Sequence, residues 1–227
     1  MGQYYKQYVK DKDGNERKFN PQNAVFLTKS GLDEARGYGD PNCSWDLDDT
    51  WSYGSLFNGL KLMEHSWIDN GHVNGVLEAI EDNPCQVAWV GDYADEAGDF
   101  DERYTEEVRD AVWSGNCLKD SPFAEMPSTH RDGFLANLDK GAYIDLAEYI
   151  GAATYTQRWD RSGGEWCIHP LPLLTAIGNG RGCGDYHGTC MGAVGAWAMD
   201  EIMYTRDASK LDGLEKVDAA GIAFREE

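Results

Sequence analysis

The segment AIGNGRGCGDYHGTC (176–190) concentrates groups that could do chemistry. It holds five glycines, two cysteines, a histidine, an arginine and an aspartate within fifteen positions. Clustered glycines allow positive φ and let backbone N–H groups converge on an anion, and an arginine can bind phosphate or carboxylate with two hydrogen bonds. One interpretation is an anion- or nucleotide-binding pocket formed by Asn179, Gly180, Arg181, Gly182, Gly184 and Asp185. The spacing matches neither a P-loop nor a dinucleotide-binding fingerprint, so the ligand class stays open.

A second interpretation of the same region is a zinc site. Five of the chain's Cys and His residues lie within 24 positions, namely Cys167, His169, Cys183, His187 and Cys190. Thiolates and imidazoles suit tetrahedral zinc, although the paired Cys-x2-Cys knuckle of many structural sites is missing. The other histidines, His65, His72 and His130, stand alone and indicate no site.

Two further interpretations concern catalysis and plain structure. Cys183 or Cys190 could act as a nucleophile with His187 as base and Asp185 as orienting group, but close neighbours in sequence rarely form such a site. Alternatively, the segment is a sharp turn whose polar side chains hold the backbone. Because no catalytic signature is recognisable, we expect a binding protein rather than an enzyme, with zinc as the only candidate cofactor.

Two acidic segments contain aromatic residues. They are WDLDDTW (45–51) and GDYAD (91–95). Such carboxylates could bind magnesium or form an acid/base pair, but in a chain with 40 Asp and Glu residues we favour a solvated surface. Aromatic side chains beside the acids are typical of protein-binding patches. The predicted partner-binding residues are Trp45, Asp46, Asp48, Asp49, Trp51, Asp92, Tyr93 and Asp95.

The overall charge restricts the partners of the chain. Its 227 residues include 20 Lys or Arg and 40 Asp or Glu, a net charge of −20. A protein this acidic repels nucleic acid and anionic membrane, so we expect neither to bind directly. No apolar run approaches the length of a membrane span and no leader is recognisable, which predicts a cytoplasmic protein. The six cysteines form no tight disulfide framework, so we expect them to be reduced.

The pattern of apolar and turn residues predicts an α+β fold. We expect one domain over 1–227, with a candidate seam at 115–133, built on a mostly antiparallel or mixed sheet with long irregular loops. The expected helices are at about 70–82 and 101–114, where apolar residues recur at helical spacing. A hairpin is expected around Asp13-Gly14, and strands at 60–67, 85–93 and 171–177. At 134–149 the Asp139-Lys140-Gly141 turn favours a hairpin, although Leu146 and Ile150 also fit a helix. Residues 193–205 fit either a strand or a helix.

Several short pieces of the chain resemble one protein family. They are MGQYYK at the start, GLKLMEH (59–65), VGDYAD (90–95), NLDKGAYIDL (137–146), GNGRGCGD (178–185) and GAWAMDEI (195–202). They are similar to an uncharacterised family of bacterial and phage-borne proteins that open on MGQYYK and carry a Gly-Asn-Gly-Arg-Gly-x-Gly-Asp loop. The family has no established activity, and Cys183 stands where it usually has a glycine. The resemblance implies a phage or mobile-element context.

Charge, acidic–aromatic segments and this resemblance together predict a protein-binding module. We expect it to inhibit a basic, nucleic-acid-handling host protein by occupying the surface that normally binds nucleic acid. The alternative is a pocket protein that binds a phosphate-containing or nucleotide-like ligand at 178–185, with or without a zinc ion.

Overall fold

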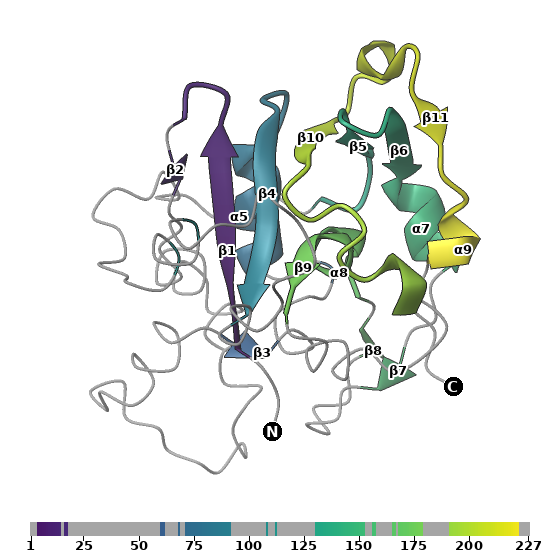
Figure 1. Ribbon diagram of the computed structural model, residues 1–227. Helices are drawn as coiled ribbons and strands as arrows, with labels where there is room; N and C mark the ends of the chain where they lie inside the picture. Colours follow the sequence, from purple (N-terminus) through teal and green to yellow (C-terminus); the bar gives the residue numbers. More distant parts are fainter. Residues whose placement is uncertain are drawn as a thin grey trace.

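The computed structural model describes residues 4–14, 16–17, 60–61, 68, 71–91, 108, 112, 130–152, 156–157, 165–166, 168–178 and 191–222. These residues form an α+β arrangement of a mixed, mainly antiparallel sheet and short helices, as the sequence predicted (Figure 1). Strands from both sides of 115–133 belong to one sheet, because β10 pairs with β4. Of the candidate seam itself, residues 115–129 lie outside the described part of the chain.

Seven strands follow one another across the sheet in the order β11-β6-β5-β10-β4-β1-β2. They are β1 (Tyr4–Asp11), β2 (Glu16–Arg17), β4 (Cys85–Gly91), β5 (Phe134–Asn137), β6 (Ala142–Asp145), β10 (Glu201–Thr205) and β11 (Glu215–Lys216). Neighbours along this path are antiparallel except β11 and β6, which are parallel. Off this path, β3 (Leu60–Lys61) pairs with β1 and β9 (Ala176–Ile177) pairs in parallel with β4. Strands β7 (Thr156–Gln157) and β8 (Glu165–Trp166) pair with each other in a separate two-stranded antiparallel sheet.

Both predicted hairpins are confirmed. In the β1–β2 hairpin, Gly14 has φ +82° and its N–H donates to the carbonyl of Asp11 at 2.9 Å. In the β5–β6 hairpin, Gly141 has φ +61°, and Oδ1 of Asn137 accepts a hydrogen bond from the N–H of Lys140 at 2.9 Å. Glycine tolerates this left-handed backbone better than any residue with a side chain, which is why the turn residues were readable from sequence.

The predicted helix at 70–82 and the predicted strand at 85–93 are also confirmed; the helix ends three residues earlier than predicted, and residues 92–93 of the strand lie outside the described part of the chain. Helix α5 spans Gly71–Ala79, and β4 begins after Asn83-Pro84. The apolar residues at helical spacing, Val73, Val76, Leu77 and Ile80, are fully buried. Figure 1 shows α5 behind β4, which places this apolar face against the sheet.

The predicted strand at 171–177 is wrong over most of its length. Residues Pro170–Thr175 form helix α8, and only Ala176–Ile177 are extended, as β9. Pro170 stands at the first helical position, where its fixed φ favours a helix and its missing N–H costs nothing. Every residue of α8 is buried, so the apolar run carries no periodicity that would distinguish a helix from a strand.

Residues 134–152 and 193–205 each combine two conformations. Within 134–149, the hairpin ends with β6 at Asp145, and helix α7 (Leu146–Ala152) begins at the next residue. In the second region, the 3-10 turn η3 (Met191–Ala193) and further turns precede strand β10. The remaining described elements are the 3-10 turn η4 (Ala208–Leu211) and helix α9 (Ala219–Ile222).

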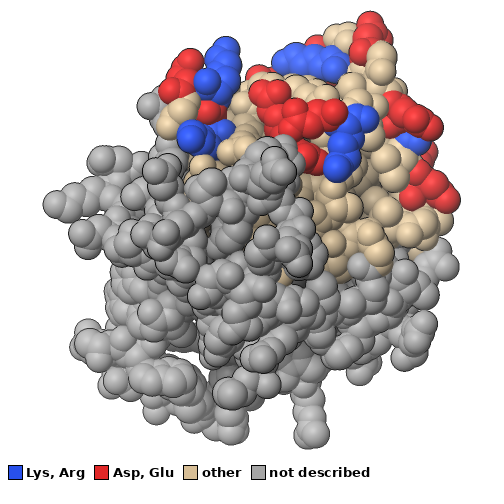
Figure 2. Space-filling model, viewed as in Figure 1, with Lys and Arg blue, Asp and Glu red and all other residues tan. Residues whose placement is uncertain are grey.

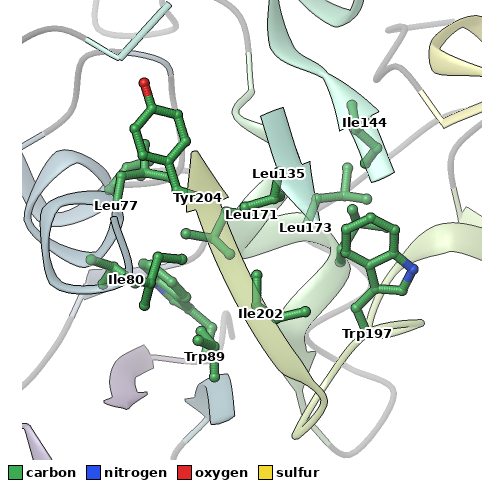
Figure 3. Close-up of a cluster of buried hydrophobic side chains, with 14 of the residues drawn as sticks. Leu77, Ile80, Trp89, Leu135, Ile144, Leu171, Leu173, Trp197, Ile202 and Tyr204 are labelled. Atoms are coloured by element: carbon green, nitrogen blue, oxygen red, sulfur yellow. The ribbon is translucent and has the colours of Figure 1, made fainter. Parts of the chain in front are cut away.

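Side chains alternate between the two faces of the sheet. Along β10, Ile202 and Tyr204 join the main core, whereas Met203 contributes to a smaller cluster on the other face. This period of two is the geometry of a strand that is covered on both sides. Figure 3 shows the main core, in which side chains from α5, β4, β5, β6, α8 and β10 meet.

The face of β4 that points away from the main core contacts two residues of the predicted helix at 101–114. Val108 and Val112 are the described residues of this segment; both are helical and buried, and they pack in one cluster with Ala88 and Val90 of β4. Their spacing of four residues puts them on one helical face, in agreement with the prediction. The other residues of 101–114 and residues 62–67 of the predicted strand lie outside the described residues.

Candidate functional site

His169 is the one predicted site residue that the structure describes. The glycine-loop residues 179–185, the acidic–aromatic segments at 45–51 and 92–95, and the four other candidate zinc ligands lie outside the described residues. The anion pocket, the zinc site and the partner-binding patch therefore stay predictions.

His169 caps a buried helix. Its Nδ1 accepts a hydrogen bond from the N–H of Leu171 at 3.1 Å, which satisfies a backbone donor at the start of α8. The side chain is buried, and burial lowers the pKa of its imidazole to about 3, with a smaller contribution from nearby His130. His169 is consequently neutral at physiological pH.

The capping bond also fixes the tautomer of His169. An Nδ1 that accepts a hydrogen bond cannot carry the proton, so the proton of the neutral ring sits on Nε2. Among the described residues, Nε2 has no hydrogen-bond partner. Metal binding through Nε2 would move the proton to Nδ1 and break the bond to Leu171. The described residues contain no group of three or more His, Cys, Asp or Glu side chains placed to hold a metal ion.

An apolar pocket of about 320 Å³ lies between the segment before β10 and the C-terminal helix α9. Its described lining consists of Leu174, Gly192, Ala193, Ala196, Trp197, Val217, Gly221 and Ile222. Leu174 and Trp197 are buried and belong to the main core, while Gly192, Ala196 and Gly221 are exposed. Figure 3 shows Trp197 at the edge of the core cluster. The pocket therefore has a core-anchored aromatic residue and small residues toward solvent.

Backbone hydrogen bonds hold one wall of the pocket on helix α8. The N–H groups of Gly195 and Trp197 donate to the carbonyls of Leu173 and Leu174 at 2.9 and 2.7 Å. These carbonyls belong to the last turn of α8, which has no further helical N–H to satisfy them. Gly195 has φ +73°, and a Cβ placed on it would lie 2.6 Å from the carbonyl oxygen of Ala176. Only glycine permits this close approach.

The opposite wall is held on the sheet and carries a carboxylate. The N–H of Val217 donates to the carbonyl of Tyr143 in β6 at 2.8 Å. Asp218 caps α9, since its Oδ1 accepts from the N–H of Ala220 at 3.0 Å. Its Oδ2 lies 3.8 Å from the position that a Cβ on Gly221 would take. The Asp218 carboxylate thus lies beside Gly221 and directly follows Val217, two residues that line the apolar pocket.

Four cations in the C-terminal half are all engaged by carboxylates. Among the described residues from 132 to 222, these are the only Lys and Arg side chains: Lys140 pairs with Asp200, Arg206 with Glu81 and Asp132, Lys210 with Asp82, and Lys216 with Asp145 and Glu148. The hydrogen bond from Lys210 holds the pKa of the Asp82 carboxyl below its usual value. Figure 2 shows Lys and Arg side chains (blue) next to Asp and Glu side chains (red) on the described part of this face.

Acidic groups remain in excess after this pairing. The described residues contain ten Lys or Arg and seventeen Asp or Glu, so the larger part of the net charge of −20 is carried by residues outside the described ranges. Asp207, Asp212, Glu215 and Asp218 are exposed. The surface that the structure describes is therefore moderately acidic, with its C-terminal cations locally neutralised.

Sequence reasoning missed the apolar pocket. Its lining comes from three separate segments, which no local pattern connects. One signal was present in GAVGAW (192–197), where small residues precede a tryptophan. Small residues next to a large aromatic side chain leave room beside the ring, but only the packing of α9 makes that room a pocket.

Comparison with known proteins adds no family to this picture. The chain matches no protein family, no curated protein and no solved structure. Among the described residues, no helix combines the length and the apolar character needed to cross a membrane.

Proposed function

We propose that the chain is an acidic protein-binding module that occupies a basic surface of a partner that handles nucleic acid. The observation that carries this proposal is the pairing of the C-terminal cations. Lys140, Arg206, Lys210 and Lys216 each contact at least one carboxylate, so among the described residues of 132–222 no Lys or Arg side chain is left for the remaining carboxylates. A net charge of −20 then acts on a partner as a negative field.

Electrostatics suits such a module to its partner. Carboxylates can replace phosphates against Lys and Arg, and the attraction extends over a Debye length of about 8 Å at physiological salt. Charge mainly accelerates association, whereas affinity also needs desolvated aromatic or apolar anchors. The segments with Trp45, Trp51 and Tyr93 are the proposed source of aromatic anchors. The resemblance to phage-borne proteins makes a host protein in the cytoplasm the proposed target.

The test is capture of a basic partner followed by kinetics. The full chain is immobilised and exposed to nuclease-treated bacterial lysate, and each captured protein is purified and its binding measured by surface plasmon resonance at several salt concentrations. We expect a basic partner whose association slows as salt rises, and whose DNA or RNA competes with this chain. Asp46→Asn/Asp48→Asn/Asp49→Asn should slow association more than it speeds dissociation.

A charge-matched variant separates a local patch from the general field. Asp13→Asn/Asp207→Asn/Asp212→Asn also removes three negative charges, at exposed positions on other parts of the chain. We expect it to slow association less than the 46–49 variant does. Failure to recover a basic partner, or a partner that binds nucleic acid and this chain at once, contradicts the proposal.

A further inference from the structure

We infer that the apolar pocket between residues 192–197 and α9 receives one apolar side chain from a Lys- or Arg-rich segment of the partner. This inference rests on the proposed function and adds the anchor that charge alone lacks. It assigns a site to residues that the sequence did not single out, and it states the chemistry of the segment that binds there.

The size and lining of the pocket define the anchor. A volume of about 320 Å³ is at the lower end of the roughly 300–1,000 Å³ of ligand sites, which fits a single large side chain. The described lining is glycine, aliphatic residues and Trp197, so it offers an aromatic and aliphatic surface to its occupant. An apolar group gains free energy there by leaving water, whereas a polar group would lose its hydration.

The charges beside the pocket define what flanks the anchor. Asp218 lies beside the lining residue Gly221, and exposed Glu215 lies on β11, two residues before the lining residue Val217. Lys216, the nearby cation, is held by Glu148 at 2.5 Å and by Asp145 at 3.9 Å. A segment with Lys or Arg next to its apolar residue therefore meets carboxylates and no unpaired described cation.

The sheet edge favours an extended segment as the occupant over a free small molecule. β11 is the last strand of the described sheet, and the N–H groups of Glu215 and Val217 donate to the carbonyls of Gly141 and Tyr143. Because neighbouring residues of a strand point their backbone groups to opposite sides, the backbone of Lys216 faces away from β6. An extended peptide can lie along this edge and place one side chain in the adjoining pocket.

Two peptides that differ only at the central residue test the inference. The probes are KRKKLKRKK and KRKKSKRKK, titrated calorimetrically into the full chain at low and at physiological salt. We expect both to bind with strong salt dependence, and the leucine peptide to bind at least about tenfold more tightly, because burial of one leucine side chain accounts for that ratio.

Two matched glycine variants test whether the leucine of the peptide binds in the pocket. Gly192 lines the pocket, a Cβ on it meets no atom within 4 Å and its φ is not positive, so Gly192→Leu adds an apolar side chain at the pocket without backbone strain. Gly151 on α7 is equally open and lies outside the pocket lining, which makes Gly151→Leu the control. We expect Gly192→Leu to abolish the preference for leucine and Gly151→Leu to keep it. Asp218→Asn retains a cap for α9 but should weaken both peptides alike.

The outcomes distinguish this inference from the proposed function. Equal, salt-sensitive affinities for the two peptides overturn the pocket assignment and leave the acidic module standing. A leucine preference that survives in Gly192→Leu places the anchor elsewhere and also overturns it. If neither peptide binds at low salt, the electrostatic attraction is absent and both proposals fail.

Discussion

His169 shows how one residue can have a structural task that its type does not reveal. Its chemistry allows metal binding, and its position beside Cys167 suggested it. In the fold, its Nδ1 is an acceptor at the start of α8 and its ring is buried. The sequence His-Pro before an apolar run carried a signal for this role, since proline at the first helical position leaves the residue before it as the cap.

Acidification should destabilise the protein through His169. Its folded-state pKa of about 3 lies below the ordinary 6.5, so between these pH values the unfolded chain binds a proton that the folded chain does not. The free energy of unfolding therefore falls as the pH drops from 6.5 toward 3, by up to about 1.4 kcal/mol per pH unit, and this group has no effect above that window. Urea unfolding followed by tryptophan fluorescence from pH 7.5 to 4.5 measures the slope.

Two variants in the same region isolate the contribution of His169. His169→Asn keeps a side-chain acceptor for the cap and cannot titrate, so it should flatten the slope despite lower stability at neutral pH. Leu173→Ala on α8 should also lower stability, by about 2–5 kcal/mol, but keep the slope of the parent protein. An unchanged slope in His169→Asn would show that other groups cause the acid sensitivity.

At the level of elements, the segment from η3 to β11 contains glycines with different structural roles. Gly192 lies in open space, Gly213 has φ +85° in open space, and Gly195 combines φ +73° with a close approach to the carbonyl of Ala176. Substitutions at the three positions therefore distinguish the cost of a left-handed backbone from the cost of a steric clash.

Alanine at these three glycines should give graded losses of stability. We expect a change within about 0.5 kcal/mol for Gly192→Ala, because the site is exposed and unstrained. Gly213→Ala should cost about 1–2 kcal/mol through its left-handed backbone. Gly195→Ala should cost more than either, because its methyl group also forces the chain away from α8 and the pocket wall with it. Equal losses at Gly195 and Gly213, measured by chemical denaturation, would argue against the close approach.

The same elements show what local sequence can specify. Both hairpins, α5 and β4 follow from turn residues and periodicity that lie within a few positions of one another. Helix α8 did not follow, because its apolar residues are all buried and a short apolar run fits a helix or a strand equally well. The anion, zinc and partner sites remain predictions at residues outside the described ranges.

At the scale of the whole molecule, the charge of −20 should oppose folding at low salt. Compact chains bring like charges together, and added NaCl screens this repulsion, since the Debye length falls from about 30 Å at 0.01 M to about 8 Å at 0.15 M. Exposed ion pairs such as Lys210–Asp82 weaken under the same change, but each contributes only about 0–1 kcal/mol. We therefore expect the melting temperature to rise over this range of NaCl.

The charge-matched variant provides the check on this prediction. Asp13→Asn/Asp207→Asn/Asp212→Asn removes three negative charges at exposed positions and should reduce the rise in melting temperature with NaCl. A melting temperature that falls with salt would mean that ion pairs outweigh repulsion in the folded state.

Sequence alone determined the acidic character of the protein, its α+β class and the elements whose signals are local. Turn chemistry and periodicity act over a few residues, so they can be read without knowing what an element packs against. Tertiary structure alone decided that β9 joins β4, that α8 is a helix and that α9 closes one side of an apolar pocket. That pocket unites Leu174, residues 192–197 and residues 217–222, and such a meeting of distant segments depends on packing, which no local pattern encodes.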